Sequence, residues 1–373
     1  MRNWKVGLTL ILIFAIAFSS SLVSPPTKKL PPFLNQGQEW VDSVFNTMSP
    51  DERIAQLFMV AAYSNRDSKH EAAITRLIEE YKIGGLVFFQ GGPLRQAAMT
   101  NRYQAKSKVP LLIAMDAEWG LGMRLDSTIN FPYQMTLGAI ADNDLIYDMG
   151  VEIAREFKRL GAHISFSPVV DVNNNPKNPV INYRAFGENR EQVTAKGVAY
   201  MKGLQDQGVM AVAKHFPGHG DTDTDSHNDL PVIPHQRTRL DSVELHPFVN
   251  LVENGVGGVM VAHMSIPSLD ATENLPSTLS KPIVEDLLKK ELGYSGLIFT
   301  DALNMKGVTK HFPPGEVDVK ALIAGNDVLV FTQDVPLALK KIKEAIKKGT
   351  LSQKDIDRRC KKVLAAKFWA GLS

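Results

Sequence analysis

The stretch Val209-Met210-Ala211-Val212-Ala213-Lys214-His215-Phe216-Pro217-Gly218-His219-Gly220-Asp221 joins a short apolar run directly to a cluster of ionisable side chains. The first five residues predict a buried strand, because they are all apolar and follow Gly208. A proline and two glycines after Phe216 exclude a helix. We therefore expect a loop from Lys214 onward, at the carboxyl end of the strand. Loops that are held by a rigid scaffold often carry catalytic residues.

Other short apolar runs along the chain have the same character. They predict strands at Ile83–Phe89, Leu111–Met115, Ile164–Val170, Gly258–Ala262, Leu297–Thr300 and Val328–Phe331. Amphipathic stretches between them predict helices at Asp144–Leu160, Glu188–Gln207, Asp241–Glu253, Lys281–Leu292 and Val335–Lys348. Strands that alternate with helices in this way indicate an α/β protein with a parallel sheet.

Polar residues follow nearly every predicted strand. They are Asp116 and Glu118, Asp171 and Asn173, Lys214 and His215, His263, and Asp301. A (β/α)₈ barrel builds its active site from the residues that follow its strands, whereas a doubly wound sheet gathers them at one switch point. The glycines near Gly91 also lack the spacing of a dinucleotide-binding turn. The pattern favours a TIM-type (β/α)₈ barrel, as a single catalytic domain, over a doubly wound sheet.

The first residues of the chain differ from the rest. Arg2 and Lys5 precede an apolar run from Val6 to Phe18, which is too short to span a bilayer comfortably and matches the core of a secretory signal. We predict a signal peptide over residues 1–24, a linker over 25–39 and the barrel over 40–373. The protein would be exported to the periplasm or the exterior, and an uncleaved membrane anchor is the alternative.

Composition limits the classes of partner. Without Arg2 and Lys5 the chain would carry 40 basic and 40 acidic residues, so no basic excess points to nucleic acid. Cys360 is the single cysteine, which excludes an internal disulfide. A balanced surface and a complete barrel make a monomer the default expectation.

The polar segment does not fit a metal site. His215 and His219 have the spacing of a helical zinc pair, but Pro217 and Gly218 remove the helix. The acidic residues from Asp221 onward lack the glycine and the glutamate of a calcium loop. We predict no metal and no organic cofactor.

Two motifs carry a resemblance to a known family. Lys-His-Phe-Pro-Gly-His-Gly, from Lys214, followed by Asp-Ser-His, from Asp225, resembles the signature of family 3 glycoside hydrolases of the β-N-acetylhexosaminidase branch. The resemblance extends from about residue 40 to about residue 370. It implies that Asp301 is the nucleophile, that His227 is the acid/base and that Asp225 orients and charges His227. It also implies a set of sugar-binding residues, namely Asp116, Arg124, Arg184, Lys214 and His215.

The implied reaction is retaining hydrolysis that releases terminal β-linked N-acetylglucosamine from peptidoglycan fragments or related oligosaccharides. A histidine acid/base is chemically reasonable, because imidazole titrates near neutrality and a carboxylate two residues away favours its protonated form. Gly218 and Gly220 further suggest that this loop closes over bound sugar.

Other functions remain open from the sequence. A β-glucosidase of the same family would generally lack the Asp225-Ser226-His227 segment, and a glycoside phosphorylase would use phosphate in place of water. A non-catalytic cell-wall-binding barrel would bind glycan without turnover. Asp301 could also be a helix cap, which is the commonest structural role of an aspartate after a strand.

Overall fold

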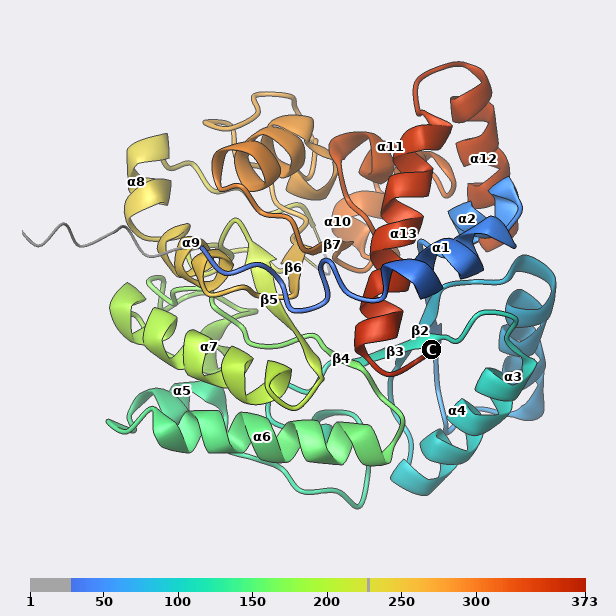
Figure 1. Ribbon diagram of the computed structural model, residues 1–373. Coiled ribbons are helices and arrows are strands. Elements are labelled where there is room, and N and C mark those ends of the chain that lie inside the picture. Colours follow the sequence, from blue (N-terminus) through green and yellow to red (C-terminus); the bar gives the residue numbers. More distant parts are fainter. Residues whose placement is uncertain (1–27, 227–228) are drawn as a thin grey trace, which may run out of the picture.

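Eight parallel strands form one sheet in the computed structural model, which describes residues 28–226 and 229–373 (Figure 1). The strands are β1 (Phe58–Ala62), β2 (Gly85–Phe88), β3 (Leu112–Met115), β4 (Ile164–Ser165), β5 (Met210–Phe216), β6 (Gly258–Val261), β7 (Leu297–Thr300) and β8 (Leu329–Val330). Their order in the sheet is β7-β6-β5-β4-β3-β2-β1-β8. A parallel bridge between Phe299 and Val328 brings the two edge strands together. The sheet is thus a nearly closed (β/α)₈ barrel, as predicted.

Helices surround the barrel (Figure 1). They are α1 (Gln38–Asn46), α2 (Pro50–Ala55), α3 (Ser68–Arg76), α4 (Pro93–Lys106), α5 (Gln134–Gly138), α6 (Asp144–Arg159), α7 (Arg190–Gln205), α8 (Arg237–Ser242), α9 (His246–Glu253), α10 (Lys306–Thr309), α11 (Glu316–Ala324), α12 (Val335–Lys347) and α13 (Gln353–Trp369). Two further helical segments, Leu77–Tyr81 and Pro282–Glu291, have the wider π-type winding.

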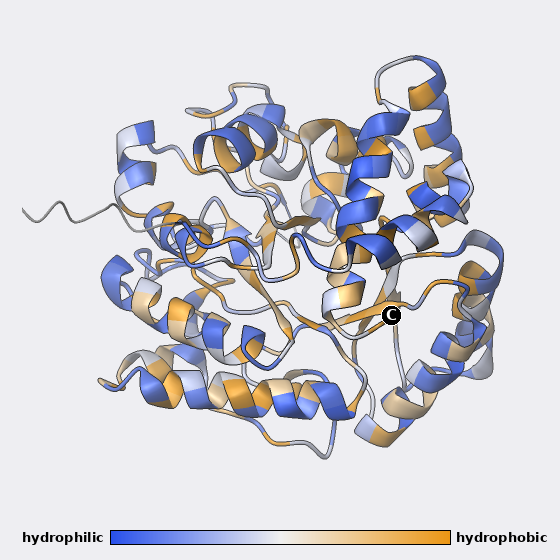
Figure 2. Ribbon diagram, viewed as in Figure 1, coloured by the Kyte–Doolittle hydropathy of each residue, from blue (hydrophilic) through white to orange (hydrophobic). Residues whose placement is uncertain are grey.

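The helices pack one apolar face on the barrel, as the two-sided colouring of α6 in Figure 2 illustrates. Ile146, Ile153 and Phe157 of α6 are fully buried, and their spacing places them on one face of a helix. Inside the barrel the rings of Phe166 and Phe299 lie 5.6 Å apart and are buried. The barrel interior is therefore a packed core and holds the loops at its carboxyl end on a rigid base.

The predicted strands are all present, mostly with tighter bounds, but the sequence reading missed β1. The run Ile54–Ala62 is apolar apart from Gln56, and no glycine or proline separates the end of α2 from the start of β1. Without a breaker, the periodicity of such a run does not distinguish a helix end from a buried strand. For this reason the sequence predicted seven of the eight strands and did not predict β1.

The expectation of a loop from Lys214 onward is wrong by three residues, because β5 continues to Phe216. Neighbouring chain segments extend the pairing on both sides of this stretch. The nitrogen of Val170 donates to the carbonyl oxygen of Lys214 at 2.8 Å, and Phe216 pairs with Val261 of β6 beyond a bulge. Lys214 and His215 therefore project from strand backbone, which fixes their positions more firmly than a loop would.

The chain ahead of α1 packs against the barrel. The nitrogen of Lys29 donates to the carbonyl oxygen of Glu253 at 2.9 Å, and Phe33 is fully buried. The predicted signal peptide, residues 1–24, lies outside the described residues. Within the part of the chain that the structure describes, no helix has the length and hydrophobicity needed to span a bilayer.

Candidate active site

A cavity of about 330 Å³ opens at the carboxyl ends of the strands. Seven of the eight site residues predicted from the sequence line this cavity: Asp116, Arg124, Arg184, Lys214, His215, Asp225 and Asp301. They lie on β5 or in the segments that follow β3, β4, β5 and β7, and the barrel brings their side chains to one place. The eighth predicted residue, His227, lies outside the described residues.

Asp116 is held between two cations. It follows β3 directly, and a short 3₁₀ turn at Leu121–Met123 returns the chain so that Arg124 faces it. Arg124 Nη2 lies 2.6 Å from Asp116 Oδ2, and Lys214 Nζ lies 2.7 Å from Asp116 Oδ1. Three residues predicted to bind sugar hydroxyls thus form one charged group.

Glu118 forms a second charged group beside the first. We call the residues of the two groups the charged floor of the cavity: Asp116, Glu118, Arg124, Arg184 and Lys214. Arg184 donates two hydrogen bonds to the Glu118 carboxylate, of 2.9 and 2.8 Å, and Lys214 Nζ lies 2.8 Å from Glu118 Oε1. Glu118 is fully buried. The sequence showed this residue after a strand but did not mark it as part of the site, because its resemblance carried no role for it. Its position two residues after Asp116, on the same strand end, was the available signal.

Both carboxylates of the floor are ionised at neutral pH. Burial alone would raise the pKa of Glu118, but Arg184 and Lys214 outweigh it and lower the pKa to about 2. Burial is likewise overcome at Asp116, where Lys214 and Arg124 hold the pKa well below its usual value. The floor therefore combines two carboxylates with three cations and offers charge-assisted hydrogen bonds to a polar ligand.

A third carboxylate, the buried Asp171, positions His215. The Nδ1 of His215 lies 2.7 Å from Asp171 Oδ2, and the nitrogen of His219 donates to Asp171 Oδ1 at 2.6 Å. Burial opposes ionisation of Asp171, but His215 lowers its pKa below the usual value. His215 Nε2 then faces Arg184 at 3.3 Å. Asp171 is a further residue that the sequence placed after a strand without assigning it to the site.

His219 is a buried structural histidine. Thr222 and Ser226 contact its two ring nitrogens at 2.8 and 3.1 Å, and burial lowers its pKa to about 4. With both ring nitrogens engaged by residues of the loop, His219 supports the shape of the loop.

Asp301 follows β7, and its carboxylate faces the cavity that Asp225 also lines. Its Oδ1 accepts a hydrogen bond from the nitrogen of Ala302 at 2.7 Å. The helix that follows, α10, has Met305 at its N-cap position, so Asp301 does not cap it. Asp301 is therefore not a helix cap, and two carboxylates of different loops line one cavity.

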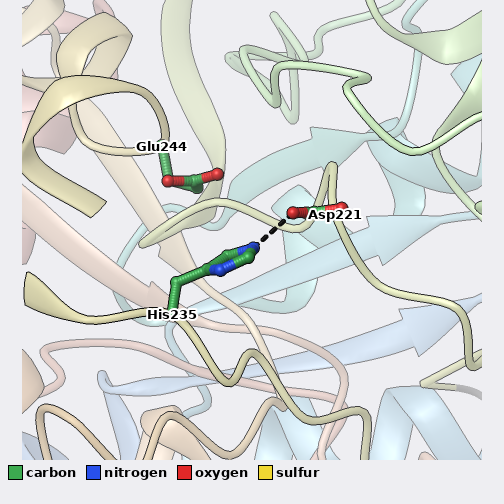
Figure 3. A group of neighbouring side chains, drawn as sticks. All are labelled: Asp221, His235 and Glu244. Atoms are coloured by element: carbon green, nitrogen blue, oxygen red, sulfur yellow. Dashed lines mark hydrogen bonds and ion pairs between the residues drawn. The ribbon is translucent and has the colours of Figure 1, made fainter. Parts of the chain in front are cut away.

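Three side chains from the chain between β5 and α9, those of Asp221, His235 and Glu244, lie close together (Figure 3). His235 Nε2 makes a close contact with Asp221 Oδ2. Ligand atoms of the three residues lie within 4.8 Å of one another, so this group could hold a metal ion. A cation is already present, however, since Arg239 Nη2 lies 3.0 Å from Glu244 and 3.8 Å from Asp221. We interpret the group as an ion-pair brace for the loop that carries Asp225.

Comparison with known proteins gives the family. The model of the glycosyl hydrolase family 3 N terminal domain matches residues 49–366. The chain is 36% identical over 290 residues to β-hexosaminidase A of Pseudoalteromonas piscicida, covering 72% of this chain and 48% of that protein. It is 33% identical over 335 residues to the β-hexosaminidase LpqI of Mycobacterium tuberculosis, covering 86% of this chain and 83% of that protein.

The solved structures include a family 3 β-N-acetylglucosaminidase from Paenibacillus, which superimposes with a TM-score of 0.82 at 36% sequence identity. That match covers 87% of this chain and 63% of the other. The chain thus spans about half of the Pseudoalteromonas relative and less than two thirds of the Paenibacillus structure. The family match covers most of the barrel, including every described site residue. The chain belongs to glycosyl hydrolase family 3.

Proposed function

We propose that the protein is a retaining β-N-acetylhexosaminidase that removes terminal β-linked N-acetylglucosamine. The observation that carries this proposal is the single cavity that contains Asp301, Asp225 and the charged floor. Hydrolysis of a glycosidic bond needs a nucleophile and a proton donor on either side of the bond, and a set of polar groups that fixes the sugar. The relatives named as β-hexosaminidases support the choice of sugar.

The reaction would proceed in two steps. The carboxylate of Asp301 attacks the anomeric carbon and forms an ester, while His227 gives its proton to the departing oxygen. Water then attacks the anomeric carbon and loses its proton to His227, the bond from that carbon to the Asp301 oxygen breaks, and the sugar leaves with its original configuration. The role of His227 rests on the sequence resemblance. Asp225 would hold the ring of His227 and favour its charged form.

The charged floor would bind the sugar hydroxyls. Arg124, Arg184 and Lys214 are donors whose positions are fixed by the buried carboxylates, so little conformational entropy is lost when they bind a hydroxyl. Asp116 would accept hydrogen bonds from the sugar. His215, held by Asp171, would contribute its Nε2 atom.

We further propose the cellular setting that the sequence suggested. The signal-like N-terminus would export the protein, and the natural substrate would be a fragment of peptidoglycan or a related oligosaccharide. A monomer is the assembly that fits a barrel with its own complete cavity.

Two aryl glycosides test the proposal directly. We expect the protein to hydrolyse p-nitrophenyl β-N-acetylglucosaminide in preference to the matching β-glucoside, and Asp301→Asn to abolish the reaction. A preference for the glucoside would indicate a glucosidase. A rate that depends on added phosphate would indicate a phosphorylase, and turnover of neither substrate would argue for a binding protein.

A further inference from the structure

Three aromatic side chains form an exposed cluster at the rim of the active-site cavity. The rings of Trp119 and Tyr133 meet edge to face with centroids 4.9 Å apart, and those of Tyr133 and Tyr183 lie 4.6 Å apart. Tyr133 and Tyr183 are each 47% exposed. Large aromatic side chains in solvent are more often found at binding sites than elsewhere on a surface. We call these three residues the rim cluster.

The chain itself places the rim cluster at the mouth of the cavity. Trp119 follows Glu118 in the chain, and Tyr183 precedes Arg184. Because Glu118 and Arg184 form a buried ion pair, their neighbours Trp119 and Tyr183 are held close together. Trp119 and Tyr183 line the cavity beside that pair. The floor is therefore charged and enclosed, while the adjacent rim is aromatic and partly open to solvent.

We propose that Trp119 and Tyr183, with Tyr133 packed against both, bind the leaving-group sugar, the ring on the reducing-end side of the cleaved bond. This inference rests on the proposed glycosidase function. An enzyme that removes terminal units places the terminal sugar in the enclosed part of its cavity, where the charged floor binds hydroxyls. The rest of the glycan must leave through the mouth and pass the rim cluster. No role for these three residues followed from the sequence.

The chemistry and shape of the rim cluster fit a single sugar ring. A pyranose carries rows of C–H groups on its faces, which pack against aromatic rings, while its hydroxyls remain in water. The planes of Trp119 and Tyr183 are inclined at 56° with centroids 6.3 Å apart. Such an angled pair makes a concave support, whereas a flat row of rings would suit a long polymer. Three rings are also far smaller than a stable protein interface.

Two substrates that differ only in the leaving group separate this role from binding of the terminal sugar. N,N′-diacetylchitobiose leaves a sugar ring, while β-N-acetylglucosaminyl fluoride leaves a fluoride ion. We would measure kcat/KM for both with the full chain and with Trp119→Ala, Tyr183→Ala and the double variant. Tyr147→Ala is the matched control, because Tyr147 lies on α6 and is partly exposed but does not line the cavity.

We expect the ratio of kcat/KM for the disaccharide to that for the fluoride to fall about five- to tenfold in each rim variant. The ratio should remain at the wild-type value in Tyr147→Ala. Equal losses on both substrates, or no change in the ratio, would overturn the inference while leaving the proposed function intact. Failure of the wild-type protein to cleave either substrate would instead count against the proposed function.

Discussion

Glu118 is fully buried between Arg184 and Lys214, so its charge balances two cations whose side chains are only 15% and 2% exposed. Replacing it by Gln would leave those cations partly uncompensated. We expect Glu118→Gln to lower the free energy of unfolding by about 3–5 kcal/mol, which is typical for removal of one partner of a buried ion pair. Urea denaturation followed by circular dichroism would measure the change.

An exposed ion pair provides the control for that variant. Glu80 contacts Arg76 on the surface of the molecule at 2.9 Å, with both side chains more than half exposed. Exposed ion pairs contribute little to the free energy of unfolding, because water screens the two charges. Glu80→Gln should leave the denaturation midpoint unchanged, and an equal effect of both variants would contradict the importance we assign to burial.

Glu118 should also make the free energy of unfolding depend on pH. The folded protein holds the pKa of Glu118 at about 2, below the ordinary value of 4.5, so the unfolded chain takes up its proton first as pH falls. The stabilisation is complete above about pH 4.5 and is lost as pH falls towards 2. Unfolding free energies measured across this range should fall more steeply for the wild type than for Glu118→Gln. Parallel curves would contradict the assigned cause.

How far single residues could be predicted depends on what positions them. Asp116, Asp301 and Lys214 lie at strand ends, and the alternation of strands and helices was enough to bring them to one face. Asp171 and Glu118 lie at strand ends too, yet their roles depend on partners more than forty residues away, His215 and Arg184. Spacing in the sequence does not report such pairings.

At the scale of elements, the loop after β5 is fixed by close backbone packing. A Cβ on Gly220 would lie 1.8 Å from the carbonyl oxygen of Val172, so Gly220→Ala must move the loop that carries Asp225. A displacement of about 1 Å in a catalytic group can reduce a rate by about 100-fold. We expect a loss of that order in kcat on the aryl N-acetylglucosaminide.

Gly208→Ala is the matched control for this change. Gly208 has a positive φ, of 80°, unlike Gly220, but a Cβ there would meet no atom within 4 Å. Its substitution should cost some stability through backbone strain and leave kcat unchanged. Comparable losses of kcat in both variants would contradict the claim that displacement of the loop limits the reaction.

The brace of Asp221, His235 and Glu244 gives a second prediction for this element. Since Arg239 already supplies positive charge beside both carboxylates, we expect the loop to hold its shape without a metal ion. Activity should survive dialysis against EDTA, and added zinc should not increase it. A loss of activity that zinc or another divalent ion restores would show that the group is a metal site.

The elements themselves were only partly predictable. The helix α6 and the strand β7 were predicted almost to the residue, because clear breakers or caps bound their apolar patterns. The strand β1 was missed because it continues the apolar run that begins in α2. The extension of β5 to Phe216 depends on pairing with β6 and with the chain after β4, and these are tertiary contacts that local sequence does not encode.

At the scale of the whole molecule, the barrel brings seven residues that are far apart in the sequence to one cavity. This cavity contains the charged floor, the carboxylates of Asp225 and Asp301, and the aromatic rim. The sequence predicted this architecture because polar residues followed so many strands. The residues that close the barrel could not be predicted, since the closing bridge joins Phe299 of β7 to Val328, which directly precedes the two-residue strand β8.

The central claim is that Asp301 attacks the sugar and forms a covalent intermediate. A ring-fluorinated N-acetylglucosaminyl fluoride tests it most directly, because its leaving group permits the first step while the ring fluorine slows the second. Mass spectrometry should find one added sugar on the peptide that contains Asp301, and none on Asp301→Asn. An unlabelled protein, or a label on another residue, would contradict the account.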